Sequence, residues 1–179
     1  MGHEQSQTVF SLQVVEFTTV AKEFCLFLER AGSFESHDFI VKLHRFLALL
    51  YVKALAVGNP DPATDEGCEK FVTEVDWVII RDNVNTHLGA HDAYLDFFDH
   101  LMRETPEPVT CTVSENVADI YQDLKDFITN YQLGIEEVMA DALHECMQQF
   151  RQYWGQRLTA TLRHLHHVLY VEGIESERE

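Results

Sequence analysis

Residues 114–131 read SENVADIYQDLKDFITNY and carry the clearest helical pattern in the chain. Their large apolar side chains fall within about 120° of a helical wheel, and aspartates and an asparagine occupy the opposite side. The apolar side consists of Val117, Ile120, Tyr121, Leu124, Phe127, Ile128 and Tyr131. Ser114 is placed to cap the first turn. This stretch therefore predicts an amphipathic helix with one face in a core.

Prolines and glycines divide the rest of the chain into further helical segments. All four prolines lie within residues 59–62 and 105–108, where the fixed φ angle and the missing N–H exclude a helix interior. Thr73 and Asp76 have the spacing of a capping box at the start of another helix. The predicted helices cover residues 8–31, 37–57, 73–88, 91–103, 114–133, 135–153 and 156–171. No stretch alternates apolar and polar residues with the period of a strand.

These segments predict an all-α fold, a single-domain and mostly antiparallel bundle of six or seven helices. The domain is expected to span residues 1–173, followed by a frayed acidic tail at residues 174–179. The segment 37–57 is apolar nearly all round its wheel, so we predict that it lies near the centre of the bundle. Short connections at Gly32 and Gly134 favour adjacent antiparallel neighbours.

The composition excludes several classes of protein. The chain has 13 Lys and Arg against 30 Asp and Glu, a formal net charge of −17, and 46% hydrophobic residues. The hydrophobic content excludes a disordered chain, and the negative charge argues against binding to nucleic acid or to an anionic membrane surface. The N-terminus lacks the pattern of a signal peptide, and the four cysteines form no C-x-x-C pair. We therefore expect a cytoplasmic protein with reduced thiols.

Three sets of side chains have spacings that metal sites use. They are His87 with His91, the trio Glu137, Asp141 and His144, and the row Asp119, Asp123 and Asp126. Two imidazoles four residues apart, as in the histidine pair, can share a metal ion. In the trio, the carboxylate three residues before the histidine resembles the pair that binds iron in ferritin-like bundles. A row of aspartates on one helix can hold Mg²⁺. A second ferritin-like pair is absent, Gly89 interrupts the histidine pair, and the acids lie opposite apolar faces. Solvated helix faces are the preferred interpretation, so no metal, cofactor or catalytic residue is predicted.

Asp82 falls inside an apolar row of its predicted helix, the row that contains Val75 and Ile79. A carboxylate on a buried row needs a cationic partner, and Arg45 or Arg81 could supply one. The sequence leaves open whether Asp82 is part of a structural ion pair or an acid in a pocket.

A corner rich in large side chains lies where the last two predicted helices meet. It reads Tyr153-Trp154-Gly155-Gln156-Arg157. A glycine permits a kink or a close approach of the backbone there, and Trp with Arg is the composition of a binding hot spot. Trp154, Gln156 and Arg157 are therefore the candidate interaction residues, although the preferred interpretation is that Trp154 is a core residue and Arg157 pairs with one of the acids.

Three stretches together resemble an uncharacterised bacterial family, domain of unknown function 5063. They are VTEVDW at residues 72–77, ADIYQDLKDF at residues 118–127, and YWGQRL at residues 153–158. The resemblance runs over most of the chain, from the first predicted helix to residue 170. It implies a small all-α bacterial protein, and it implies no catalytic residues because the family has no assigned activity.

The preferred hypothesis is a non-catalytic cytoplasmic module that binds another protein, because helix faces are the strongest pattern and no motif assembles an active site. The alternative is a metal-dependent hydrolase acting on nucleotides or phosphate esters, built on Asp119, Asp123, Glu137, Asp141 and His144. A second alternative, an acidic mimic of nucleic acid, rests on the net charge alone. A helix face left apolar by the bundle would suit a two-fold homodimer.

Overall fold

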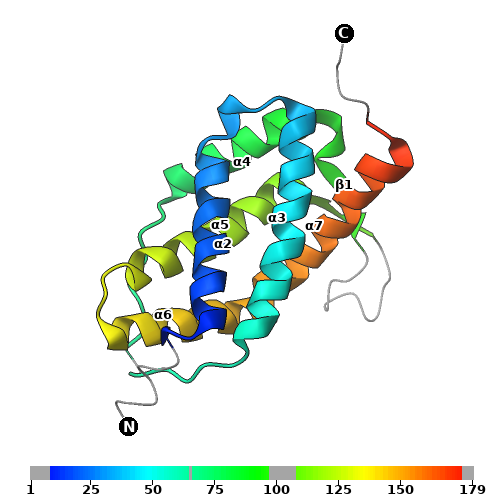
Figure 1. Cartoon of the computed structure of the whole chain (residues 1–179). Helices are drawn as coiled ribbons and strands as arrows, with labels where there is room; N and C mark the ends of the chain where they lie inside the picture. Colours follow the sequence, from blue (N-terminus) through cyan, green and yellow to red (C-terminus); the bar gives the residue numbers. More distant parts are fainter. Residues whose placement is uncertain (1–8, 65, 97–107, 175–179) are drawn as a thin grey trace.

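The computed structural model describes residues 9–64, 66–96 and 108–174, which form a mostly helical bundle (Figure 1). The α-helices are α2 (Leu12–Glu29), α3 (Ser36–Val57), α4 (Glu74–Leu88), α5 (Val113–Tyr131), α6 (Glu136–Gln149) and α7 (Gly155–His167). A short 3-10 turn follows α2, namely η1 (Ala31–Ser33), and another follows α4, namely η2 (Gly89–His91). A π-helical turn follows α6, namely η4 (Phe150–Trp154), and another follows α7, namely η5 (Val168–Glu172). The predicted helical class is confirmed. Within these residues no helix has the length and hydropathy of a membrane span.

Helix α5 lies at the centre of the bundle, with α2, α4, α6 and α7 packed around it. Figure 1 shows α2 and α3 side by side, crossing over α5. The prediction that residues 37–57 form the central helix is wrong. Helix α3 packs mainly on α2 and α7, and it leaves Leu49, Val52 and Leu55 exposed by 43, 60 and 58%. A wheel that is apolar all round shows what a helix could bury, but among the described residues neighbours cover only one side of α3.

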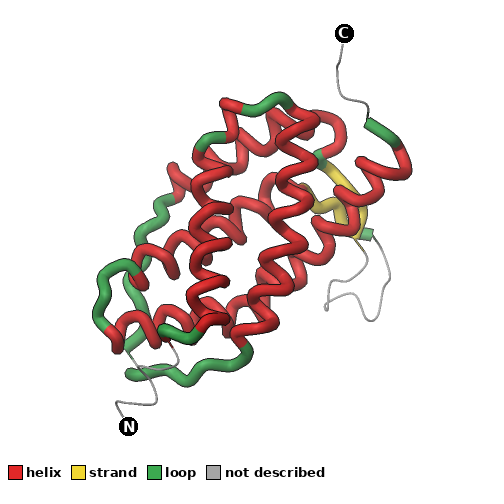
Figure 2. Tube along the Cα trace, viewed as in Figure 1, coloured by secondary structure: helices red, strands yellow, loops and turns green. Residues whose placement is uncertain are grey.

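A two-stranded antiparallel sheet stands in place of the helix predicted for residues 91–103, so that prediction is wrong over its described part. Residues 97–103 lie outside the described residues. Strand β1 (Ala93–Asp96) pairs with β2 (Val109–Thr112), with Ala93 opposite Thr112 and Asp96 opposite Val109. The sheet lies at the edge of the bundle beside α7 (Figure 2).

Asp92 is the residue that ties this sheet to the start of α5. Its carboxylate accepts hydrogen bonds from the backbone N–H of Ser114 (2.8 Å) and from the Ser114 hydroxyl (2.6 Å), and its carbonyl accepts one from the N–H of Val113 (2.9 Å). These long-range bonds hold the chain after Asp92 in an extended course. Ser114 is therefore not the N-cap of α5 as predicted, and the hydroxyl of Thr112 instead accepts a bond from the N–H of Glu115 at 3.3 Å.

Helices α6 and α7 are joined through η4 without the helix break predicted at Gly155. Gly155 keeps right-handed helical backbone angles, and a Cβ atom there would overlap the carbonyl oxygen of Phe150 and come within 2.9 Å of its ring. The glycine thus permits the close approach that a π-helical turn requires. Trp154 is turned into the core, where it is fully buried and its Nε1–H donates to the carbonyl of Cys146 at 3.1 Å.

Candidate functional site

The three stretches at residues 72–77, 118–127 and 153–158 meet at the carboxylate of Asp119. Trp77 on α4 donates from Nε1 to Asp119 Oδ1 at 2.9 Å, and Tyr153 on η4 donates from its hydroxyl to Asp119 Oδ2 at 2.7 Å. One carboxylate on α5 therefore holds two aromatic side chains from two other helical elements, α4 and η4. Charge-assisted bonds of this kind are about twice as strong as neutral ones.

An arginine lies over each of these two rings. The guanidinium carbon of Arg157 is 4.9 Å from the centre of the Tyr153 ring, and that of Arg81 is 5.4 Å from the Trp77 ring. Both distances are within the range of cation–π attraction. We call these five residues the Asp119 cluster: Trp77, Arg81, Asp119, Tyr153 and Arg157. Trp77, Asp119 and Arg157 are half-buried and Tyr153 is 38% exposed, so the cluster is a surface feature with fixed side chains.

Tyr153 stays protonated at physiological pH. Burial raises the pKa of its hydroxyl to about 12, and the hydrogen bond to Asp119 adds to the effect. The hydroxyl therefore serves as a donor to Asp119 and not as a base.

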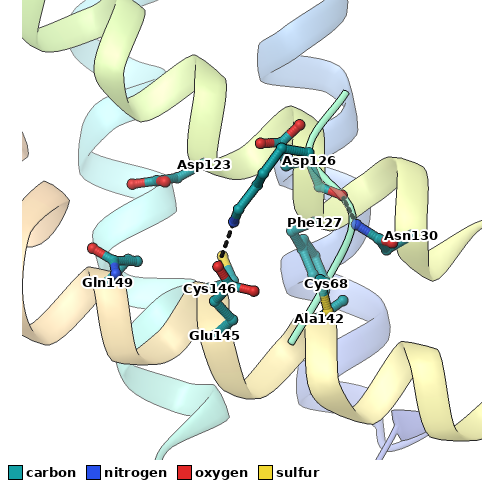
Figure 3. A pocket seen from close by; sticks show the side chains of 10 residues that line it. Cys68, Asp123, Asp126, Phe127, Asn130, Ala142, Glu145, Cys146 and Gln149 are labelled. Carbon is teal, nitrogen blue, oxygen red and sulfur yellow. Dashed lines mark hydrogen bonds and ion pairs between the residues drawn. The ribbon is translucent and has the colours of Figure 1, made fainter. Parts of the chain in front are cut away.

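Asp123 lies one turn after Asp119 on α5 and lines a small hollow (Figure 3). Residues of the segment before α4 and of α6 form the other sides of this hollow. Lys70 also lines this hollow and forms an ion pair with Glu145. The pKa of Asp123 is raised to about 7, mainly by burial; Lys70 opposes this rise, and the nearby acids Asp119, Asp126 and Glu145 add to it. The hollow has a volume of about 10 Å³, which is the space of a single water. It cannot admit a nucleotide or a phosphate ester.

The two cysteines in this hollow are not nucleophiles at neutral pH. Burial raises the pKa of Cys68 to about 11, and burial raises the pKa of Cys146 well above its ordinary value. Nucleophilic attack by cysteine requires the thiolate, which these surroundings disfavour.

Buried acids on α5 and α6 bind the backbone of the segment that connects α3 to α4. Asp126 Oδ1 accepts the N–H groups of Phe71 (2.7 Å) and Val72 (3.0 Å). Asp141 Oδ1 accepts those of Ala63 (2.7 Å) and Thr64 (2.9 Å). Both carboxylates are nearly fully buried, at 3 and 8% exposure, so the interpretation of these two acids as parts of solvated helix faces is wrong. The hydrogen bonds to the backbone are what allow the acids to stay inside the protein.

The structure does not assemble the residues with metal-site spacings into one site. Asp141 is bound to the connecting segment, His144 Nδ1 lies 2.8 Å from the carbonyl oxygen of Pro60, and Glu137 is exposed. Asp119 already accepts from two aromatic side chains. Across residues 9–64, 66–96 and 108–174, no three His, Cys, Asp or Glu side chains are grouped in a way that could hold a metal ion.

The two histidines that could have shared a metal are also occupied separately. The His87 ring stacks on Phe39 at 4.2 Å, and its Nε2 lies 3.0 Å from the carbonyl oxygen of Ala31. His91 instead lies 3.1 Å from a carboxylate oxygen of Glu172. Each imidazole therefore joins a different pair of elements in the bundle.

Asp82 is an exposed acid, so the expectation of a buried carboxylate is wrong. Its side chain is 60% exposed and pairs with its neighbour Arg81 at 2.7 Å. The row that contains Val75 and Ile79 faces solvent, with these residues exposed by 67 and 51%. The structure thus decides for a surface ion pair and against a pocket acid.

The predicted corner contributes only part of the candidate site. Trp154 is a core residue, Gln156 is exposed, and Arg157 belongs to the Asp119 cluster. Sequence reasoning missed Tyr153 and the α4 pair Trp77–Arg81 as members of the site. A signal was present in both cases, because the aromatic residue and the arginine stand four positions apart, which places them together on a helix.

Comparison with known proteins agrees with the fold. The chain matches the family model described as Domain of unknown function (DUF5063) over residues 8–171. It is similar to the crystal structure of protein BF1032 from Bacteroides fragilis, with 39% sequence identity and a TM-score of 0.81, over 97% of this chain and 100% of that chain. No curated protein matches the chain. This chain therefore belongs to the DUF5063 family, a domain of unknown function.

Proposed function

We propose that this chain is a non-catalytic protein-interaction module that binds its partner through the Asp119 cluster. The observation that carries the proposal is the shared carboxylate, since Asp119 holds Trp77 and Tyr153 by bonds of 2.9 and 2.7 Å. Trp, Tyr and Arg are the side chains most enriched in binding hot spots. Because hydrogen bonds already hold these rings, their immobilisation on binding costs less entropy than that of free side chains.

The charges of the cluster also favour a protein partner. Arg157 presents a guanidinium group in a molecule with a formal net charge of −17, and the guanidinium of Arg81 lies over Trp77 while it pairs with Asp82. A partner with carbonyl or carboxylate acceptors beside an apolar side chain would meet the arginines and the rings together. Arg157 is itself positioned from behind, because its Nη1 donates to the buried Asn116 side chain at 3.2 Å.

Two observations weigh against the hydrolase alternative. The hollow at Asp123 has the volume of one water, and Asp141 and His144 are bound to the segment between α3 and α4. A phosphate ester would therefore find little space beside Asp123, and Asp141 and His144 would not be available to act on it. The cysteines in the hollow offer no thiolate in its place.

A site-specific photocrosslinker in the native host tests the interaction. We would place it at Gln156, which is exposed beside the cluster, and as a matched control at Gln13, an exposed glutamine on α2. We expect one discrete protein adduct from position 156 and none from position 13. Arg81→Ala should reduce the yield of that adduct at least about fivefold. Arg163→Ala removes the same charge from a 57% exposed arginine on α7 and should leave the yield unchanged.

Either of two results would contradict the proposal. The first is the absence of an adduct at position 156, or the same adducts at both positions. The second is turnover of a nucleotide or phosphate ester with Mg²⁺ or Mn²⁺ that disappears in Asp123→Asn, which would show that the protein is an enzyme.

A further inference from the structure

A second and larger cleft lies on the other flank of α4, away from the Asp119 cluster. Its volume is about 380 Å³, and it is bounded by the last turn of α2, the start of α4 and the middle of α5. The lining residues are Glu29, Phe71, Val72, Asp76, Ile79, Ile80, Asn83, Tyr121 and Lys125. Clefts that bind small molecules start at about 300 Å³ and combine apolar walls with a few polar groups. We call this space the α2–α4 cleft.

The walls of the α2–α4 cleft are apolar and open to solvent. Phe71 and Ile79 are 36 and 51% exposed, and Val72 and Ile80 continue the apolar surface inward. Apolar area at a concave site gains free energy when a ligand covers it, at about 25 cal/mol per Å². The walls therefore suit the hydrocarbon or aromatic body of a ligand.

Two carboxylates line the cleft, and one oxygen of each accepts hydrogen bonds from other groups of the protein. Glu29 Oε1 accepts from the Tyr121 hydroxyl at 3.0 Å and from Lys125 Nζ at 2.6 Å. Asp76 Oδ2 accepts from the N–H of Thr73 at 3.0 Å and from its hydroxyl at 2.7 Å. Glu29 Oε2 and Asp76 Oδ1 accept no hydrogen bond from any described residue. Two acceptor oxygens from two helices are thus open in one cleft.

The net charge of the residues that line the cleft favours a positively charged ligand. Two carboxylates face one ammonium, that of Lys125, so the lining has a net charge of −1 with both acids ionised. The hydrogen bonds from Thr73 lower the pKa of Asp76, which keeps this acid charged at neutral pH. A cationic ligand gains from this balance, while an anion would be repelled by it.

We propose that the α2–α4 cleft binds a small organic amine. Its ammonium group donates to Glu29 Oε2 and Asp76 Oδ1, and its apolar body packs on Phe71 and Ile79. The site is separate from the Asp119 cluster, so the proposal stands or falls independently of the protein-interaction function. It adds a small-molecule ligand to the protein partner proposed above.

Titration of the whole chain with 2-phenylethylamine tests this proposal, with amide chemical shifts as the readout. We expect shifts centred on residues that line the cleft and a dissociation constant of about 1 mM, a value in keeping with the size of the probe. The anion 3-phenylpropionate has a similar ring and the opposite charge, and it should bind at least about tenfold more weakly.

Two lysine substitutions provide a matched pair. Ile79→Lys places a positive charge in the cleft and should weaken amine binding at least about tenfold. Ile135→Lys makes the same change at an isoleucine of similar exposure, 56%, at the start of α6, and should leave binding unchanged. Glu29→Gln keeps an oxygen for Tyr121 and Lys125 but removes the charge, and it should also weaken the amine.

Each contrary outcome overturns the proposal. No binding of 2-phenylethylamine would do so, as would equal binding of 3-phenylpropionate. Equal affinity in Ile79→Lys and the unsubstituted chain would show that the amine binds elsewhere on an acidic surface. Circular dichroism of each variant confirms that a loss of binding is not a loss of fold.

Discussion

Gly155 is the residue on which the turn between α6 and α7 depends. Its missing Cβ leaves room for the Phe150 carbonyl and ring. Gly155→Ala should therefore lower the free energy of unfolding by about 3 kcal/mol, because backbone and ring must both shift. Gly32→Ala is the control, since a Cβ at Gly32 meets nothing within 4 Å. Urea unfolding should show a change of no more than about 0.5 kcal/mol for the control. Equal midpoints for the two variants would contradict the close approach.

At the scale of elements, the connection between α3 and α4 is held by side chains of α5 and α6. Asp141 accepts three hydrogen bonds from Ala63 and Thr64, at 2.6 to 2.9 Å. Asp141→Ala leaves these donors without an acceptor and should cost about 3 kcal/mol of unfolding free energy, with faster hydrogen exchange at both amides. Glu137→Ala removes an exposed acid one turn earlier on α6 and should change stability by no more than about 0.5 kcal/mol. Similar losses in both variants would show that the connection does not depend on Asp141.

For the whole molecule, the burial of Asp123 between packed helices, with further acids beside it, makes stability depend on pH. The pKa of Asp123 is about 7 in the fold and near its ordinary value of 3.8 when unfolded. The folded state therefore binds the extra proton between these values. This contribution to stability is complete below about pH 4 and is lost as the pH rises to about 7.

Asp123→Asn removes that titration and leaves the other groups in place. The free energy of unfolding should fall between about pH 5 and pH 8 in the unsubstituted chain. In Asp123→Asn this fall should be smaller by about 2 kcal/mol, a value that allows for the partial exposure of Asp123. Asp61→Asn, at an exposed acid, should leave the difference unchanged. Urea unfolding at both pH values measures it, and an unchanged pH dependence in Asp123→Asn would contradict a raised pKa.

Features that depend on neighbours within a few positions could be predicted from the amino acids alone. The period of 3.6 residues in 114–131 is local, so it predicted α5 and the burial of its apolar side correctly, but Asp126 and Asn130 on the opposite side are buried as well. The capping box of Thr73 and Asp76 is present as predicted, for the same reason. The helical class follows from these local patterns repeated along the chain. The family resemblance rested on short stretches of residues and is confirmed as well.

Only the tertiary structure decided which helix is central and which polar residues share a site. Helix α3 has a more apolar wheel than α5, but one of its sides has no neighbour among the described residues. Asp92 forms its bonds with Ser114, 22 positions away, and Asp119 forms one with Trp77, 42 positions away. A helical wheel gives the direction of each side chain from its own axis and nothing about the axis of another helix. The β1–β2 sheet and the Asp119 cluster both depend on how the elements are placed relative to one another. Each joins residues far apart in the sequence that only the packing of the chain brings together.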